Sequence, residues 1–175
     1  EASEADIESS LEELIAQDEG DELEFKSTLR WCLRENRADK KLEVVIMKSI
    51  AAFSNGYGGT LLIGVNDSGE VIGLENDFSI LGNSRDGFEL HLRELIKKNF
   101  KETFATNNIK ITFCAIENSD VCVLQIKRAF EPIYIDVQDK AGNKTKKLYV
   151  RSGNSSIEIP IEEVSKFLSS RFTMK

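Results

Sequence analysis

The sequence predicts an α+β fold, a single domain in which a mixed β-sheet is covered by helices. Apolar residues recur at helical spacing in some segments and alternate with polar ones in others, so helices and strands are interspersed along the chain. The segment 60–65, Thr-Leu-Leu-Ile-Gly-Val, is an apolar run typical of a central buried strand. A length of 175 residues suits one domain with a sizeable core and leaves little room for a second.

The N-terminal segment is expected to be an acidic, disordered leader over residues 1–9, followed by the folded domain over 10–175. Two neighbouring serines at positions 9 and 10 each precede a glutamate by three residues, which is the spacing of a capping box. An apolar face follows them, so we expect a short helix over about 10–17. Gly20 ends this helix.

The first strand is expected over residues 22–26, where polar and apolar residues alternate. Leu23 and Phe25 then face the core. Glu24 and Lys26 share the opposite face, because successive side chains of a strand point to opposite sides.

The remaining elements follow from apolar spacing and from turn residues. A tight turn is expected at residues 66–69, Asn-Asp-Ser-Gly. Pro160 is expected to open the last helix, because proline suits the first position of a helix. In chain order we expect a helix capped by Asp39 and ended at Gly56, strands over 60–65 and 70–74, a loop over 75–87, a helix over 88–100, a hairpin of strands 109–115 and 121–127, strands near 133–137 and 147–151, and a helix from Pro160.

The glycine cluster Gly56-Tyr57-Gly58-Gly59 does not have the sequence of a known phosphate-binding loop. No Lys-Ser or Lys-Thr follows it, and it precedes a strand rather than opening a helix. The favoured interpretation is a helix stop and a tight strand entry, with glycine where a Cβ atom would clash. Close approach of the backbone to a phosphate is the alternative.

Composition argues against several classes of protein. No apolar run has the length of a membrane span, and no signal-peptide pattern opens the chain, so a cytoplasmic protein is expected. Cys32, Cys114 and Cys122 form no CxxC pair and His91 is the single histidine, which excludes a structural zinc site of the usual spacing. Buried thiols are expected instead, and the last two cysteines could face each other on neighbouring strands.

The charge is distributed unevenly. The net charge is −7, but residues 1–24 contain eleven acidic residues and no basic one, which leaves 19 acidic against 23 basic residues over 25–175. The body of the domain is therefore mildly basic. The acidic segment is either a solvated lead-in or a competitor of nucleic acid for the basic surface.

Three motifs together resemble a known family. They are Glu19-x-x-x-x-Glu24-Phe25-Lys26, then the stretch from Ala51 to Gly69 (AAFSNGYGGTLLIGVNDSG), then Tyr149-Val150-Arg151-Ser152-Gly153. This combination resembles the AlbA-type domain of the Schlafen family, Schlafen AlbA_2, from roughly Leu11 to Phe172. The glycine-rich helix-to-strand segment is the most specific of the three.

The resemblance implies a nucleic-acid-handling domain. In animal Schlafens this domain type is similar to a metal-dependent endoribonuclease that acts on transfer and ribosomal RNA. By motif position, Glu19, Glu24 and Asp67 become catalytic residues and the ligands of Mg²⁺ or Mn²⁺. Lys26 becomes the adjacent catalytic residue, a basic side chain that could steady the charge growing on the scissile phosphate. Oxygen-only ligands suit these ions. Asn66 stands where many relatives also have an acid, and the additional zinc site of the animal proteins is absent here.

The residues allow this reading but also simpler ones. Gly20 permits a bend that could bring Glu19 back toward Glu24. Glu24 and Lys26 could instead form a surface ion pair, and Asp67 could be only a turn residue.

Basic residues could form a track for phosphate groups. Trp31 and Tyr57 could stack on bases; alternatively the basic residues are a solvated surface and Trp31 belongs to the core. The residues expected to bind nucleic acid are Arg30, Arg34, Arg37, Lys127, Lys147 and Arg151.

The leading functional hypothesis is a domain that binds structured, tRNA-like RNA and cleaves it. The alternatives are a non-catalytic DNA- or RNA-binding module of a larger regulatory or defence protein, and an ATP-binding domain. Because the chain begins with Glu1 rather than methionine, further domains of a longer parent protein are expected. A homodimer is also considered.

Overall fold

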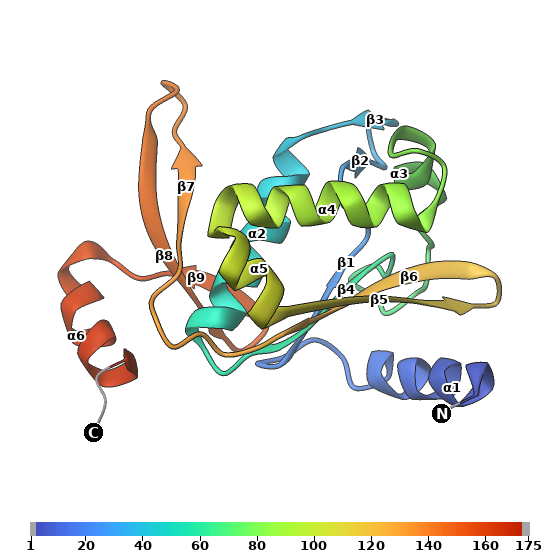
Figure 1. The fold of residues 1–175 in the computed structure, drawn as a ribbon, viewed down its shortest axis with the longest axis horizontal. Coiled ribbons are helices and arrows are strands. Elements are labelled where there is room, and N and C mark those ends of the chain that lie inside the picture. Colours follow the sequence, from blue (N-terminus) through green and yellow to red (C-terminus); the bar gives the residue numbers. More distant parts are fainter. Residues whose placement is uncertain (1–2, 173–175) are drawn as a thin grey trace.

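The computed structural model describes residues 3–172 and has a mixed four-stranded sheet at its centre (Figure 1). The strand order is β1 (Leu23–Lys26), β4 (Gly59–Ile63), β6 (Ser119–Ile126) and β5 (Ile109–Ile116). β1 is parallel to β4, whereas the other neighbours are antiparallel. The predicted α+β fold with a mixed sheet and covering helices is confirmed.

One face of this sheet is covered by most of the helices. They are α2 (Lys41–Asn55), α3 (Glu75–Ile80), α4 (Arg85–Phe100) and α5 (Glu102–Asn108). The larger apolar core lies between these helices and the sheet and includes Phe53, Leu61, Ile63, Phe88 and Leu92, each fully buried. Burying such side chains contributes on the order of 2 kcal/mol apiece, so this layer fixes the sheet against α2 and α4.

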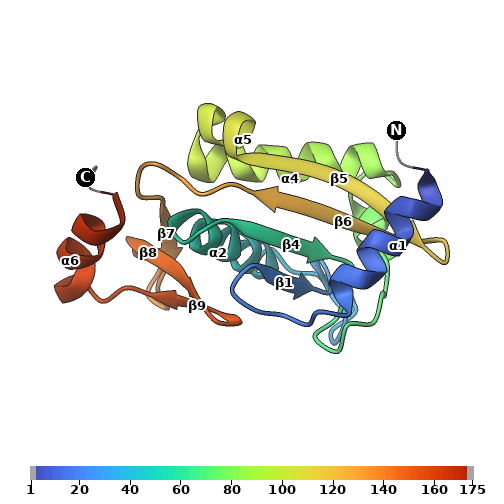
Figure 2. The same cartoon turned by 90° about the horizontal axis from the view of Figure 1, so that it is seen from below.

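The opposite face is covered by α1 (Glu4–Ile15), which lies in front of the sheet in Figure 2. Its residues Leu11 and Ile15 form a smaller core with Phe25 and Leu62. Leu23 and Phe25 thus face α1, while Glu24 points to the α2 side. The alternation predicted for the first strand is confirmed.

The expected disordered leader is wrong for residues 3–9, and residues 1 and 2 lie outside the described part. Helix α1 begins at Glu4 because Ser3, not Ser9 or Ser10, is its N-cap. The Ser3 side chain accepts a hydrogen bond from the Asp6 N–H at 3.2 Å, and the Asp6 carboxylate accepts one from the Ser3 N–H at 3.0 Å. Asp6 thus takes the capping-box place that glutamate usually fills.

A smaller sheet stands beside the main one. It contains β7 (Tyr134–Gln138), β8 (Lys144–Ser152) and β9 (Ser155–Glu158), and it packs on α2 through β8. Helix α6 (Ile161–Phe172) follows and lies at one end of the molecule (Figure 1). A two-stranded ribbon, β2 (Trp31–Cys32) and β3 (Arg37–Ala38), lies toward the other end.

Tertiary contacts decide several elements that the sequence did not predict. Residues 70–74 form only a single bridge between Val65 and Val71, not a strand. The predicted loop over 75–87 contains α3, whose buried Asp77 accepts hydrogen bonds from three backbone N–H groups over 29–31 at 2.8 to 2.9 Å. Burial raises the pKa of Asp77, an effect that these three hydrogen bonds oppose. Helix α5, the β2–β3 ribbon and β9 were likewise not predicted.

The cysteines do not face each other. Cys114 is paired with Val121 and Cys122 with Phe113 across the β5–β6 hairpin, so their side chains lie on opposite faces of the sheet. All three cysteines are free thiols. None of the helices between residues 3 and 172 combines the length and apolar character that a bilayer crossing requires.

Candidate functional site

Glu24 is buried and is paired with two cations. One carboxylate oxygen, Oε1, lies 2.6 Å from Lys26 Nζ and accepts a hydrogen bond from Ser49 Oγ at 3.0 Å. The other, Oε2, lies 2.6 Å from Arg151 Nη1. Only 5% of the residue is exposed. Glu24 and Lys26 therefore share one face as predicted, but Glu24 is an internal ion-pair partner under α2.

Arg151 fastens β8 to the segment that leads into β1. Its side chain is only 3% exposed and donates hydrogen bonds to the Gly20 carbonyl at 2.9 and 3.0 Å and to the Leu23 carbonyl at 3.1 Å. The guanidinium also lies 4.9 Å from the centre of the Phe53 ring. These internal contacts use most of the guanidinium donors, so they do not favour the predicted contact of Arg151 with nucleic acid, which stays a prediction.

Glu19 lies along the outer edge of β1. Its Oε1 accepts a hydrogen bond from the Phe25 N–H at 2.7 Å, and the Gly20 N–H donates to the Leu23 carbonyl at 2.9 Å. The chain therefore does return beside β1, as the glycine suggested. Glu19 satisfies backbone groups of an edge strand, which would otherwise be open to pairing.

Asp67 belongs to an exposed turn after β4. The turn is organised by Asn66, whose Oδ1 accepts hydrogen bonds from the N–H groups of Ser68 and Glu70 at 3.0 Å each. Ser68 and Gly69 line a shallow hollow together with Ile15 of α1, so this turn borders the α1 side of the sheet. Glu24 points to the other side.

The structure does not assemble the three carboxylates into a metal site. Among residues 3–172 no three acidic, histidine or cysteine side chains are grouped so that they could hold an ion. The carboxylate of Glu24 is already neutralised by Lys26 and Arg151, which leaves it a poor ligand for a hard cation. The residues in this arrangement therefore do not fit Mg²⁺ or Mn²⁺.

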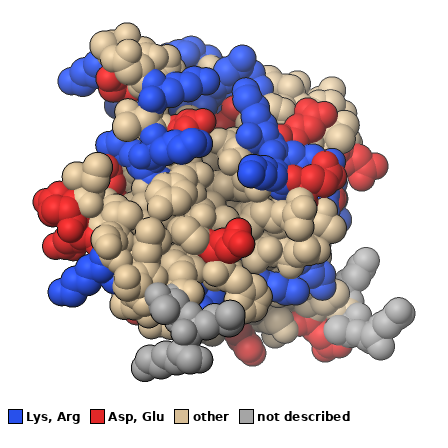
Figure 3. Space-filling model, turned by 60° about the vertical axis from the view of Figure 1, so that its left-hand side comes forward, with Lys and Arg blue, Asp and Glu red and all other residues tan. Residues whose placement is uncertain are grey.

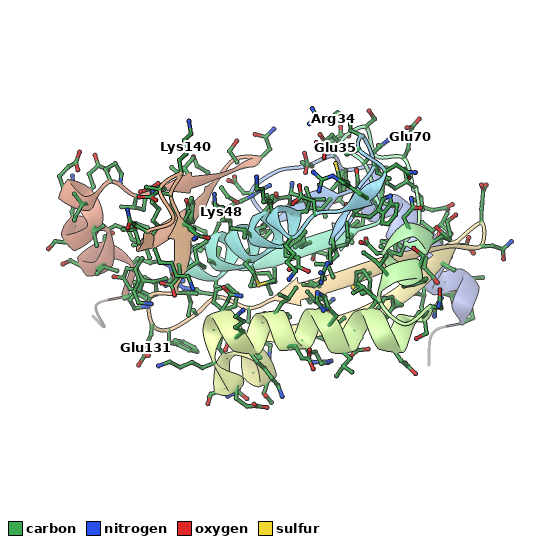
Figure 4. All side chains as sticks on the ribbon, turned by 90° about the horizontal axis from the view of Figure 1, so that it is seen from above. Arg34, Glu35, Lys48, Glu70, Glu131 and Lys140 are labelled. Carbon is green, nitrogen blue, oxygen red and sulfur yellow. The ribbon has the colours of Figure 1, made fainter. Side chains whose placement is uncertain are left out.

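The remaining basic residues predicted to bind nucleic acid fall into two groups. Arg34 and Arg37 are exposed on the β2–β3 ribbon beside Glu35, and Arg30 pairs with Glu43 at 3.4 Å. Lys127 is exposed just after β6 of the main sheet. Lys147 lies on β8 and pairs with Glu158 at 2.8 Å, which raises the pKa of the lysine. In Figure 4, Arg34 of the ribbon and Lys140 of the β7–β8 turn lie far apart.

Basic charge is concentrated around the β7–β8 hairpin. Between positions 127 and 151 the chain has seven basic and three acidic residues. Figure 3 shows Lys and Arg gathered mainly over the upper half of one face. We call the exposed members the hairpin patch: Lys127, Arg128, Lys140, Lys144 and Lys146. Lys144 and Lys146 were among the basic residues considered for a phosphate track, whereas Lys140 was not, although its place in a polar hairpin was visible in the sequence.

The glycine-rich segment has a structural role. Gly58 has a φ of +84°, and a Cβ atom there would lie 2.6 Å from the Ile126 carbonyl oxygen, so only glycine lets the chain pass the end of β6. Asn55 is fully buried just before it. Its amide donates to the carbonyls of Ile133 and Tyr149 and accepts from the Ile133 N–H, each at 2.8 Å. Asn55 therefore holds two distant segments against the end of α2.

Two of the exposed aromatic residues lie beside the basic surface or the groove segment. Tyr57 is 80% exposed and lies under the Arg128 guanidinium, 5.6 Å from the ring centre. Trp31 is half-buried on the ribbon. Phe130, which the sequence did not single out, is 92% exposed.

These features define an α+β domain with a mixed sheet, a buried Glu24–Arg151 ion pair and a basic hairpin. The profile of the family Schlafen, AlbA_2 matches residues 19–160, and the chain belongs to this family. The resemblance predicted from the three motifs is confirmed.

A solved structure of low sequence identity shares the fold, and a second one is reported with it. The crystal structure of the DIP2311 protein from Corynebacterium diphtheriae has a TM-score of 0.59 at 17% identity and covers 95% of this chain. This chain spans 32% of the length of that protein. The N-terminal domain of a RecG-related protein from Nitrosomonas europaea, solved by NMR, has a TM-score of 0.47 at 20% identity over 94% of this chain and 97% of that domain. No curated protein matches the sequence.

Proposed function

We propose that this domain binds nucleic acid, with RNA favoured over DNA, and that the hairpin patch contacts the phosphate backbone. The observation that carries the proposal is the concentration of uncompensated basic residues on and beside one exposed hairpin. Of the patch lysines, only Lys146 has an acidic partner, Asp136 at 3.2 Å, among residues 3–172. Both groups of this pair are exposed, so it contributes little and a phosphate can replace the carboxylate.

The position of the acidic segment supports the proposal. Eleven acidic residues lie between positions 1 and 24, and the helix that carries many of them packs on the opposite face of the main sheet from α2. The hairpin packs against α2. Lys140, Lys144 and Lys146 of the hairpin are exposed, so among the described residues the acidic helix leaves these members of the patch uncovered.

Salt dependence tests this proposal. If five basic residues contact phosphates, log K should fall with log salt concentration at a slope of about −3.5 for a single strand and about −4.5 for a duplex. Fluorescence anisotropy of a labelled RNA hairpin, and of DNA of the same sequence, would measure the slope and the RNA preference. A slope near zero, or no binding at low salt, would refute the proposal.

A paired-lysine variant localises the contact. The variant Lys144→Ala/Lys146→Ala should reduce the magnitude of the slope by about 1.4 to 1.8, since two phosphate contacts are lost. Lys40→Ala/Lys41→Ala, at the start of α2, removes the same charge elsewhere and serves as the matched control. Equal losses in the two variants would show that net charge, rather than the hairpin patch, governs binding.

Endoribonuclease activity is the second candidate function. It is favoured by the contact between Glu24 and Lys26 on a rigid strand, next to Glu19, at the positions that the family motif marks. Incubation of an RNA hairpin with the domain in Mn²⁺, Mg²⁺ or EDTA tests it. Cleavage by the parent domain that disappears in Lys26→Ala, with circular dichroism showing that the variant is folded, would support the activity. Absence of cleavage by the parent domain in every condition would refute it.

A further inference from the structure

A groove of about 510 Å³ lies between the α4–α5 junction and the start of β7. Its apolar lining includes Phe100 and Phe104, which are almost fully buried, and Tyr134 of β7. The size lies within the range of small-ligand sites. Lys101 and Lys146 line the same groove, so the apolar hollow has a basic border.

Phe130 projects from the segment that borders this groove, and its backbone is held at both ends. The Ala129 N–H donates to the Ser54 carbonyl at 2.8 Å, and Ile133 exchanges two hydrogen bonds of 2.8 Å with the side chain of Asn55. Pro132 further restricts the residue before it. An almost fully exposed phenylalanine is thus presented on a fixed backbone, which limits the entropy lost when a ring stacks on it.

Polar groups at the groove can contact the phosphate and the base edge of a nucleotide. Lys101 and Lys146 lie at the lining and can contact phosphate oxygens. The side-chain amide of Asn108 has no hydrogen-bond partner among residues 3–172, so both its donor and its acceptor are available to a base edge. The single acidic lining residue, Glu131, points outward from its loop in Figure 4.

We propose that this groove accepts an unstacked base of a single-stranded nucleic acid segment. The base stacks on Phe130, its edge meets the Asn108 amide, and the adjoining phosphates lie on Lys101 and Lys146. A planar apolar ring joined to an anion matches an apolar hollow with a basic border, whereas an uncharged apolar peptide would leave the lysines without a role. This inference rests on the proposed function and specifies the form of nucleic acid that the domain prefers.

The test compares single-stranded RNA with a blunt duplex of the same sequence. Phe130→Ala should weaken single-strand binding about 5- to 150-fold, the usual range for one lost stacking contact, and leave duplex binding unchanged. Leu90→Ala, which removes another exposed apolar side chain from α4, is the matched control and should change neither affinity. Far-UV circular dichroism checks that each variant is folded.

A second readout reports stacking directly. Phe130→Trp should retain single-strand affinity, and its added fluorescence should be quenched by the single strand and not by the duplex. If duplex and single strand bind but Phe130→Ala matches the control and Phe130→Trp is not quenched, the groove inference is wrong and the hairpin patch proposal stands. If the parent domain binds neither form, both proposals are wrong.

Discussion

Replacement of Glu24 by glutamine should destabilise the fold, whatever its effect on function. The change removes the negative charge that faces Arg151 at 2.6 Å and Lys26 at 2.6 Å, while it keeps the size of the side chain. Arg151, at 3% side-chain exposure, would remain as a buried cation without a counterion. Breaking a buried pair in this way costs about 3–5 kcal/mol.

The lower end of this range is expected for Glu24→Gln. Arg151 keeps its hydrogen bonds to the Gly20 and Leu23 carbonyls, and Lys26, at 25% side-chain exposure, is rehydrated at little cost. A loss of about 3 kcal/mol, divided by an m-value of about 2 kcal/mol/M, moves the urea midpoint down by about 1.5 M. Urea titrations at pH 7, followed by circular dichroism, measure the shift.

Two further variants test whether the Glu24–Arg151 ion pair stabilises the fold. Glu22→Gln changes a neighbouring exposed carboxylate and should alter the free energy of unfolding by no more than about 0.5 kcal/mol. In a double-mutant cycle with Arg151→Met, the coupling to Glu24→Gln should reach about 2 kcal/mol. Additive effects, or a Glu24→Gln midpoint equal to that of the parent, would refute the structural role of the ion pair. Loss of cleavage in a Glu24 variant is therefore informative only if the variant is folded.

Two other predictions concern the interior. Asn55→Ala removes three hydrogen bonds of 2.8 Å at a fully buried site and should lower the free energy of unfolding by about 3 kcal/mol; an unchanged thermal midpoint would contradict its role in holding Ile133. Burial raises the pKa of the Cys122 thiol well above its usual value, and that of Cys114 less strongly, so both remain protonated at pH 8. Titration with a disulfide reagent should therefore label Cys122 only after unfolding, and prompt labelling of all three thiols in the native protein would contradict the described burial.

Patterns among neighbouring residues of the sequence predicted the site only in part. Alternation along the first strand correctly placed Glu24 and Lys26 on one face, and a glycine correctly marked the return of Glu19 toward β1. Local rules do not say what covers that face. Ser49 of α2 and Arg151 of β8 bind the Glu24 carboxylate that the family motif suggested as a metal ligand, and Arg151 is 127 positions away from Glu24.

The sequence alone determined the class of fold, most of its helices and strands, and the family, because periodicity, turn residues and the glycine-rich motif are local properties of the chain. Only the tertiary structure decided that α3 forms around Asp77, that Asn55 holds Ile133, and that Phe130 stays exposed beside a groove. These outcomes depend on which distant backbone groups need hydrogen bonds and which surfaces bury each other, and neither quantity is encoded within a short window of sequence.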